Sequence, residues 1–197
     1  MRIKYIFFVF SCLLLAACGG QKQTGNVFNI MDFGAVGDGQ TDDAIAIQAA
    51  IDACAQAGGG QVLVPAGHTF LCSPFKLASF VELHLEANSR LLANPDESVY
   101  TESAFRENRG EGMMWISGKN LEQVSITGMG TIDGNGVAFM GKELEDSYEL
   151  KPVTDFDPRP HVLTLEAIDR LVIRDITLCN SPYWTVHLIG CKDAVIE

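Results

Sequence analysis

The stretch DFGAVGDGQTDDAIAIQAAIDACAQAGGG, residues 32–60, decides the fold of this chain. It reads as a glycine-rich loop, one amphipathic helix and a glycine stop at 58–60, where glycine readily takes the left-handed turn that ends a helix, with strand-like segments only after it. We expect Thr41 to cap the helix, and Asp42 and Asp43 to lie at its start, where the helix dipole favours carboxylates. Apolar residues at spacings of three and four form one stripe on the helix: Ala44, Ile47, Ile51, Cys54 and Ala55. A single helix with one apolar face, followed by strands, predicts a lid over the open end of a β-solenoid.

Short extended segments follow the helix. Gln61–Val64 is a strand ended by proline, Thr69–Leu71 and Val81–Leu85 look extended, and the strand pattern resumes at 115–126. Between them, residues 95–112 are polar and predict an exposed loop.

A heptad of one shape recurs at Asn120–Ile126, Ala167–Ile173 and Gly190–Ile196. The first interval is about twice the second, so it holds either two periods or one coil with a loop inserted between Gly136 and Pro160. A repeat of 20–30 residues built on short strands is a solenoid signature, and the Leu-x-x-Leu-x-Leu pattern of leucine-rich repeats is absent. The sequence therefore predicts an all-β fold, a parallel β-helix with an N-terminal capping α-helix.

The first residues predict a processing segment. Arg2 and Lys4 precede an apolar run, 5–17, that is shorter than the ~20 residues of a bilayer span. The run closes on Leu15–Cys18, which resembles the cleavage site of bacterial lipoproteins; ordinary secretion with a chance cysteine is the alternative. We expect a lipoprotein-type signal peptide over 1–17, lipid on Cys18, a tether over 18–26 and a β-helix domain over 27–197. This predicts an exported bacterial lipoprotein, facing the periplasm or in the outer membrane, that meets a membrane through its lipid anchor alone.

Composition narrows the function classes. The chain has 197 residues, of which 47% are hydrophobic and 20% charged, as expected of one globular domain. Its formal net charge of −11 opposes binding to nucleic acid. An exported compartment permits disulfides, and the sequence leaves the pairing of Cys72, Cys179 and Cys191 open, whereas Cys54 lies on the apolar stripe of the helix.

The last residues, 195–197, stop inside a strand in register with 172–174. Stacked repeats need a terminal cap, because an open end leaves unpaired backbone groups and bare apolar surface. We therefore expect a longer protein, truncated here at its C-terminus; a short solenoid that ends here or pairs with another chain is the alternative.

Several segments resemble glycoside hydrolase family 28, the polygalacturonases, within the pectin lyase-like β-helix superfamily. They are Asp32–Ala35, Gly37–Gly39, Thr41–Asp43, Gly58–Gly60, Val64–Gly67, Gly128–Gly136, Arg159–Pro160 and Asn180–His187. The entry segment is shared with lyases and phage tailspikes, and the Asn-Ser-Pro-x-Trp stretch makes the match specific. The resemblance implies a right-handed β-helix that hydrolyses α-linked galacturonan or rhamnogalacturonan with inversion.

The resemblance also implies where catalysis lies. The family carries its catalytic residues in Asn-Thr-Asp, Asp-Asp, His-Gly and Arg-x-Lys motifs, and none of these follows Trp184 here. We expect no catalytic residue in this chain, the catalytic residues C-terminal to Glu197, and no useful hydrolase activity from residues 1–197 alone. The alternatives are a calcium-dependent pectate lyase and a non-catalytic β-helix that binds glycans or forms a structural surface.

The candidate substrate contacts are Trp184, whose indole either stacks on a sugar or packs, and His187, which alternates with apolar neighbours and so points away from the core. Arginines in or near loops could pair with galacturonate carboxylates: Arg90, Arg106, Arg109 and Arg159. His68, His84 and His161 lack metal-ligand spacing, and we expect no metal and no cofactor. The expected partner is a pectic polysaccharide or oligogalacturonide, bound by a protein that is monomeric when full length. The acidic composition is in tension with a polyanionic substrate and favours a neutral or short oligomeric one.

Overall fold

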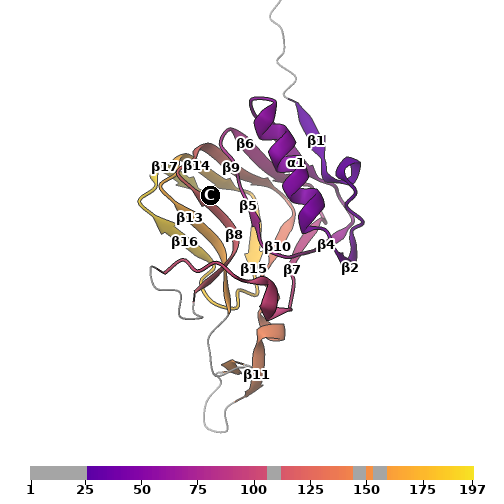
Figure 1. Cartoon of the computed structure of the whole chain (residues 1–197), viewed down its shortest axis with the longest axis vertical. Coiled ribbons are helices and arrows are strands. Elements are labelled where there is room, and N and C mark those ends of the chain that lie inside the picture. The colour runs from indigo at the N-terminus through magenta and orange to yellow at the C-terminus, as the bar shows by residue number, and fades with distance from the viewer. Residues whose placement is uncertain (1–25, 106–111, 144–149, 153–158) are drawn as a thin grey trace, which may run out of the picture.

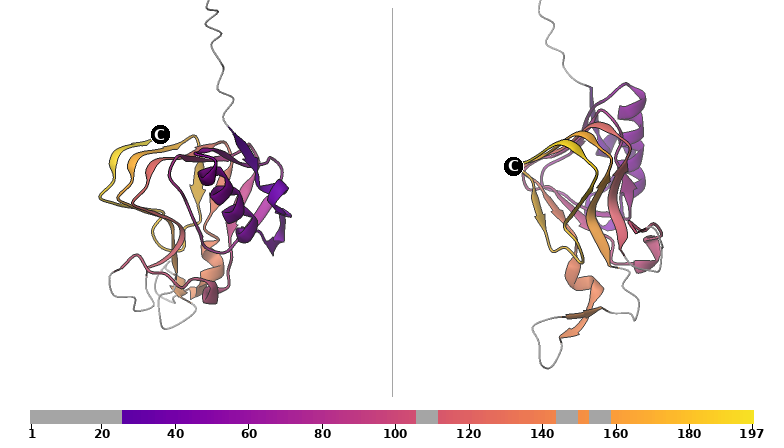
Figure 2. Two further views of the ribbon diagram at one scale, coloured as in Figure 1. Left: turned by 45° about the horizontal axis from the view of Figure 1, so that its top comes forward. Right: turned by 90° about the vertical axis from the view of Figure 1, so that its left-hand side faces the viewer.

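The structure, a computed structural model, describes residues 26–105, 112–143, 150–152 and 159–197. Within them the chain winds into a parallel β-helix whose complete coils contribute one strand to each of three sheets, A, B and C, whereas the first coil has no strand in sheet C (Figure 1). Each complete coil passes from sheet C to sheet A and then to sheet B. Viewed from the C-terminal side, the coils lie one behind another (Figure 2, right).

All the strands of sheets A, B and C pair in parallel. Sheet A contains β1 (Val27–Asn29), β3 (Gly60–Val64), β6 (Val81–Leu85), β9 (Glu122–Gly128), β14 (Asp169–Arg174) and β17 (Lys192–Ile196), in that order. Sheet B runs from β2 (Asp38–Asp42) through β4 (Thr69–Cys72), β7 (Arg90–Ala93) and β10 (Thr131–Asp133) to β15 (Thr177–Cys179). Sheet C runs from β5 (Phe75–Lys76) through β8 (Met113–Lys119) and β13 (Pro160–Glu166) to β16 (Val186–Ile189).

The three heptads stack in sheet A, as the repeat predicts. Ile126 pairs with Ile173, which pairs in turn with Ile196. Because β14 hydrogen-bonds directly to β9, the longer interval is one coil with an insertion and not two coils. The insertion contains the 3-10 helix η3 (Gly136–Phe139) and the antiparallel pair β11 (Met140–Glu143) and β12 (Leu150–Pro152).

Residues with a left-handed backbone conformation form the corner between sheet C and sheet A. The first position of the heptad has positive φ in each repeat, at Asn120, Ala167 and Gly190. The fourth position does too, at Gln123, Arg170 and Asp193. The shape of the repeat thus comes from its corner, where the chain must adopt a conformation that costs most residues about 1–2 kcal/mol.

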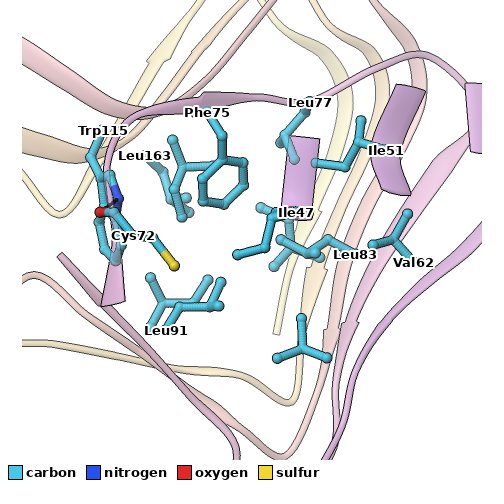
Figure 3. Packing of buried hydrophobic residues seen from close by; sticks show 14 of the residues in the cluster. Ile47, Ile51, Val62, Cys72, Phe75, Leu77, Leu83, Leu91, Trp115 and Leu163 are labelled. Carbon is cyan, nitrogen blue, oxygen red and sulfur yellow. Dashed lines mark hydrogen bonds between the residues drawn. The ribbon is translucent and has the colours of Figure 1, made fainter. Parts of the chain in front are cut away.

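The core consists of apolar rows that run along the stack, so each coil covers the one before it (Figure 3). Val62 and Leu83 lead into the isoleucine row of sheet A, and Phe70 and Leu91 begin the corresponding row of sheet B. Trp115 is fully buried and donates from Nε1 to the carbonyl oxygen of Cys72 at 2.9 Å. Each fully buried large side chain contributes about 1.5–3 kcal/mol.

The helix α1 (Ala44–Gln56) packs on β1, β3, β5 and β6 and covers one end of this core (Figures 1 and 2). Its buried face includes most of the predicted stripe, with Ala46 and Ala50 in addition and Ala55 only half-buried. The helix ends where expected, since Gly59 N donates to the carbonyl oxygen of Cys54 at 2.9 Å with a φ of 109°.

Asp42 and Asp43 lie directly before α1, as expected, with Asp43 at the N-cap position. Two other expectations were wrong: that Thr41 caps the helix, and that strands come only after it. Thr41 does not cap α1, because it belongs to β2 and its hydroxyl donates to Asp38 at 3.0 Å. Asp42 accepts instead from Ala44 N at 3.0 Å, and Asp43 accepts from the backbone of Val36 and so fixes the entry loop. Strands also precede the helix, because β1 and β2 pair with strands that come after it; the 3-10 helix η1 (Ile30–Phe33) lies between them.

The polar stretch 95–112 is only partly the exposed loop that was predicted. It contains the 3-10 helix η2 (Glu97–Val99), and Tyr100 is buried with its hydroxyl donating to the carbonyl oxygen of Asn94 at 2.7 Å.

The cysteines of the described residues are free thiols: Cys54 and Cys72 are buried, and Cys179 and Cys191 are half-buried. In the part of the chain that the structure describes, no helix is long and apolar enough to cross a membrane.

Gln48 on α1 protects the edge of sheet C. Its side-chain amide donates to the carbonyl oxygen of Lys76 at 3.2 Å and accepts from Lys76 N at 2.8 Å, as a neighbouring strand would. We expect Gln48→Ala to lower the free energy of unfolding by about 1 kcal/mol, because both hydrogen bonds are lost at a site that water reaches. Urea denaturation measures this change, with Gln56→Ala at the exposed helix end as the control. Equal midpoints for the two variants would contradict an edge-protecting role.

Candidate functional site

The outward face of sheet C is hollowed by a cleft of about 950 Å³. Met114, Ser117 and Thr164 line it from the strands, and residues 101–105 form its wall. Two hydrogen bonds tie that wall to β8 and the residue before it, from Met114 N to the carbonyl oxygen of Glu102 and from Ala104 N to that of Gly112, both 2.9 Å. A second hollow of about 270 Å³ adjoins the cleft and shares part of its lining, so the open surface continues toward α1.

Two ion pairs flank the cleft. Lys76 Nζ lies 2.6 Å from Glu102 Oε1, and Lys119 Nζ lies 2.8 Å from Glu166 Oε2. The lysine side chains are 61% and 62% exposed, and such exposed pairs are worth about 0–1 kcal/mol. Both lysines can therefore exchange their partner at little cost.

An aromatic cluster borders the cleft, which Phe105 also lines. We define the cluster as Phe105, His161, Tyr183, Trp184 and His187. The indole of Trp184 stacks on the imidazole of His161, with ring centroids 4.9 Å apart and planes inclined by 28°. Tyr183 lies nearly parallel to the indole, at 5.8 Å and 12°. Because Trp184 keeps 46% of its surface exposed while its neighbours hold its orientation, it presents a fixed apolar plane to solvent.

Two imidazoles meet beneath this plane. The Nδ1 atoms of His161 and His187 are 3.1 Å apart, and His161 is fully buried. Burial lowers the pKa of His187 below its usual value, so that the neutral ring is favoured. A contact between two ring nitrogens requires one donor and one acceptor, hence at least one neutral imidazole, which agrees with this shift.

The two predicted substrate contacts lie together on this face. Trp184 and His187 have ring centroids 4.6 Å apart, with His187 half-buried on the central part of β16. His161 joins these two residues, although its spacing in the sequence predicts no role for it. The signal that would have placed it is its position at the start of β13, the strand that pairs with the strand of His187.

The candidate arginines do not form one group. Arg159 lies over the ring of Tyr183, 5.1 Å from its centroid, at the edge of the aromatic cluster. Arg90 is not a loop residue at the cleft, because it belongs to β7 in sheet B and pairs with Asp133. Arg106 and Arg109 lie outside the described residues, as do the predicted signal peptide 1–17, Cys18 and all but the last residue of the tether.

No metal-binding group emerges in the parts of the chain that the structure describes, where no three His, Cys, Asp or Glu side chains are placed to hold an ion. His68 and His84 lie away from the aromatic cluster, before β4 and in β6. What the described face offers is a cleft with hydroxyls and ammonium groups beside an aromatic plane. Such a surface suits binding of an amphipathic ring such as a sugar.

The chain is similar to known proteins in both sequence and structure. The profile of the family described as "Rhamnogalacturonase A/epimerase, pectate lyase-like" matches residues 27–121. The chain is 34% identical over 185 residues to a probable polygalacturonase of Vitis vinifera, which covers 86% of this chain and 35% of that protein. It is 29% identical over 177 residues to an exopolygalacturonase of Zea mays, covering 88% of this chain and 39% of that one.

Among solved structures, the family 28 exopolygalacturonase of Yersinia enterocolitica superposes with a TM-score of 0.72 at 22% identity, over 87% of this chain and 38% of that one. The likeness confirms the parallel β-helix fold, and the sequence matches confirm the resemblance to polygalacturonases. The chain spans little more than a third of the length of the curated relatives described above.

Proposed function

We propose that this chain is the N-terminal part of a glycoside hydrolase that cleaves α-linked galacturonan or rhamnogalacturonan with inversion. The chain has the pectin lyase-like β-helix fold and polygalacturonase homologues. The observation that carries this proposal is the cleft on sheet C with Trp184 and His187 beside it. In this proposal the described residues bind and orient the pectic chain, and the glycan lies across the strands of sheet C.

The chemistry of inversion needs two free carboxyl groups, which the described residues of this cleft do not supply. One carboxylic acid must protonate the leaving oxygen while a carboxylate ~6.5–9.5 Å away activates water. Among the described residues, the carboxylates that line the cleft are Glu102 and Glu166, and each is paired with a lysine. The proposal therefore places the catalytic carboxylates C-terminal to Glu197 and expects residues 1–197 alone to be inactive.

The test of the proposed function compares two proteins. The coding sequence after Glu197 is determined, and the chain with and without whatever follows is assayed on polygalacturonate by release of reducing ends. We expect hydrolysis with inversion from the longer protein and none from residues 1–197. An unsaturated product that absorbs in the ultraviolet would support a pectate lyase instead, and binding without cleavage by the longer protein would support a non-catalytic glycan-binding β-helix.

We expect Trp184→Ala to weaken the binding of an oligogalacturonide about tenfold, because the exposed indole is the largest apolar plane beside the cleft. Titration calorimetry with the longest protein that the gene encodes measures the affinity. Met129→Ala, which truncates an apolar side chain that is 73% exposed near the end of β9, is the matched control and should bind as the unchanged protein does. Unchanged affinity in the Trp184 variant would show that the indole only packs against its neighbours.

The proposal includes the cellular setting expected from the leader. We propose export as a bacterial lipoprotein, anchored through lipid on Cys18 and tethered by residues 18–26, with a monomeric domain facing the periplasm or in the outer membrane. The support for this is the sequence Leu15–Cys18 after a short apolar run.

A further inference from the structure

A row of polar side chains crosses sheet C at the level of the cleft. Lys76 pairs in register with Ser117, Ser117 with Thr164, and Thr164 with His187, so the row has one member on each of four adjacent strands. Neighbouring strands lie ~4.8 Å apart, which puts the Ser117 and Thr164 side chains within reach of one small group. Both line the cleft.

The hydroxyl of Thr164 destabilises the folded protein. Its side chain is 3% exposed, and its hydroxyl has no hydrogen-bond partner among the residues that the structure describes. A buried hydroxyl without a partner destabilises the folded state, and valine would fill the same volume without that cost. A ligand group in the cleft would give this hydroxyl the partner that it lacks in the protein.

Two ammonium groups lie in or beside this row. Lys76 lies at one end of it, and Lys119 stands two residues beyond Ser117 on β8. Each lysine carries three donors, and one carboxylate of the protein accounts for one of them. In a chain of net charge −11, two cations near the unpartnered hydroxyl of Thr164 make a local site for an anion.

We propose that Ser117, Thr164, Lys76 and Lys119 form a subsite that reads the carboxylate of an acidic sugar. This inference rests on the proposed function and adds to it the group on the glycan that is recognised and the residues that recognise it. The two hydroxyls donate to the carboxylate oxygens, and the lysines supply charge-assisted hydrogen bonds, which are about twice as strong as neutral ones. The exposed pairs with Glu102 and Glu166 exchange for the ligand at little cost. The subsite resolves the tension between the acidic chain and a polyanionic substrate, because the cations are placed where the carboxylate binds.

The test uses two trisaccharides, α-linked trigalacturonate and the same molecule with its carboxyl groups reduced to alcohols. Binding of each to the full-length protein is measured by calorimetry for the unchanged protein, Lys119→Met, Thr164→Val and a control, Lys192→Met, which changes an exposed lysine of sheet A. We expect the unchanged protein and the control to bind trigalacturonate at least about tenfold more tightly than the reduced form, since one charge-assisted interaction is worth about that factor. Lys119→Met should lose most of this preference and Thr164→Val part of it, with binding of the reduced sugar unchanged within about twofold.

Thr164→Val carries a second readout. Because it removes an unpaired buried hydroxyl, we expect the melting temperature to rise by about 2–4 °C while the preference for the acidic sugar falls. A lower melting temperature with unchanged preference would show that Thr164 only packs, and it would overturn its assigned role. Equal binding of both sugars by the unchanged protein, or an unchanged preference in Lys119→Met, would overturn the carboxylate subsite and leave the proposed function standing. Binding of neither sugar by the unchanged protein would count against the proposed function itself.

Discussion

Gly128→Ala is expected to lower the free energy of unfolding by about 3–5 kcal/mol, enough to unfold a marginally stable domain. Gly128 ends β9 with a φ of +106°, where an L side chain is strained. A Cβ at this position would also lie 2.1 Å from the carbonyl oxygen of Leu85, in the strand of the previous coil. Backbone cannot move aside as a flexible side chain can, so the stacking of β9 on β6 must be disturbed.

The matched control for this prediction is Gly67→Ala. Gly67 has a φ of +79° in an exposed turn, and nothing lies within 4 Å of the added Cβ. This substitution therefore measures the cost of the backbone conformation without the clash, about 1 kcal/mol. Urea denaturation of both variants separates the two contributions. A difference of less than about 1 kcal/mol between them would mean that the coils adjust without cost.

Asp133→Ala is expected to lower the free energy of unfolding by about 3 kcal/mol at pH 7. The carboxylate is 3% exposed and joins β7 to the segments that follow β10 and β15: it pairs with Arg90, accepts from Asn180 Nδ2 at 2.9 Å and accepts from Asn135 N at 2.8 Å. All of these hydrogen bonds are lost together. The loss is limited because Arg90 is 45% exposed, so water can solvate its guanidinium when the partner is gone.

The effect of Asp133 should depend on pH in a defined direction. Burial alone would raise the pKa of this carboxyl, but the hydrogen bonds from Asn135, Arg90 and Asn180 outweigh burial and lower the pKa below its usual value. A carboxyl with a lowered folded pKa stabilises the fold above its unfolded pKa and loses that contribution as the pH falls through the folded value. The difference between the unchanged protein and Asp133→Ala should therefore be full at pH 7 and shrink below about pH 4.

Urea denaturation between pH 7 and pH 3 measures this dependence, with Asp169→Ala as the control. Asp169 is an exposed aspartate in β14, and its replacement should change stability by less than about 0.5 kcal/mol. A cost for Asp133→Ala that stays constant to pH 3 would contradict the role assigned to the ionised carboxylate.

The sequence by itself determined the coil and its register. The heptads repeat because each copy meets the same constraints, an apolar row facing the core and a left-handed corner, and both leave a local signal. The helix stripe is local in the same way, since residues three and four apart share one face of a helix. Its cap was not determined, because Thr41 finds its hydrogen bond within β2 and Asp42 takes the helix start.

Only the tertiary structure decided which distant side chains share a site. His161 and His187 are 26 residues apart and meet because β13 and β16 pair in sheet C, and Arg90 and Asp133 are 43 apart and meet across β7 and β10. In the same way, the pairing of β9 with β14 chose one coil with an insertion over two coils. The physical reason is that local periodicity fixes which face a residue takes, whereas only the pairing of strands decides which coils are neighbours and so which residues stand side by side. An insertion lengthens the chain between two paired strands without changing their pattern or their register.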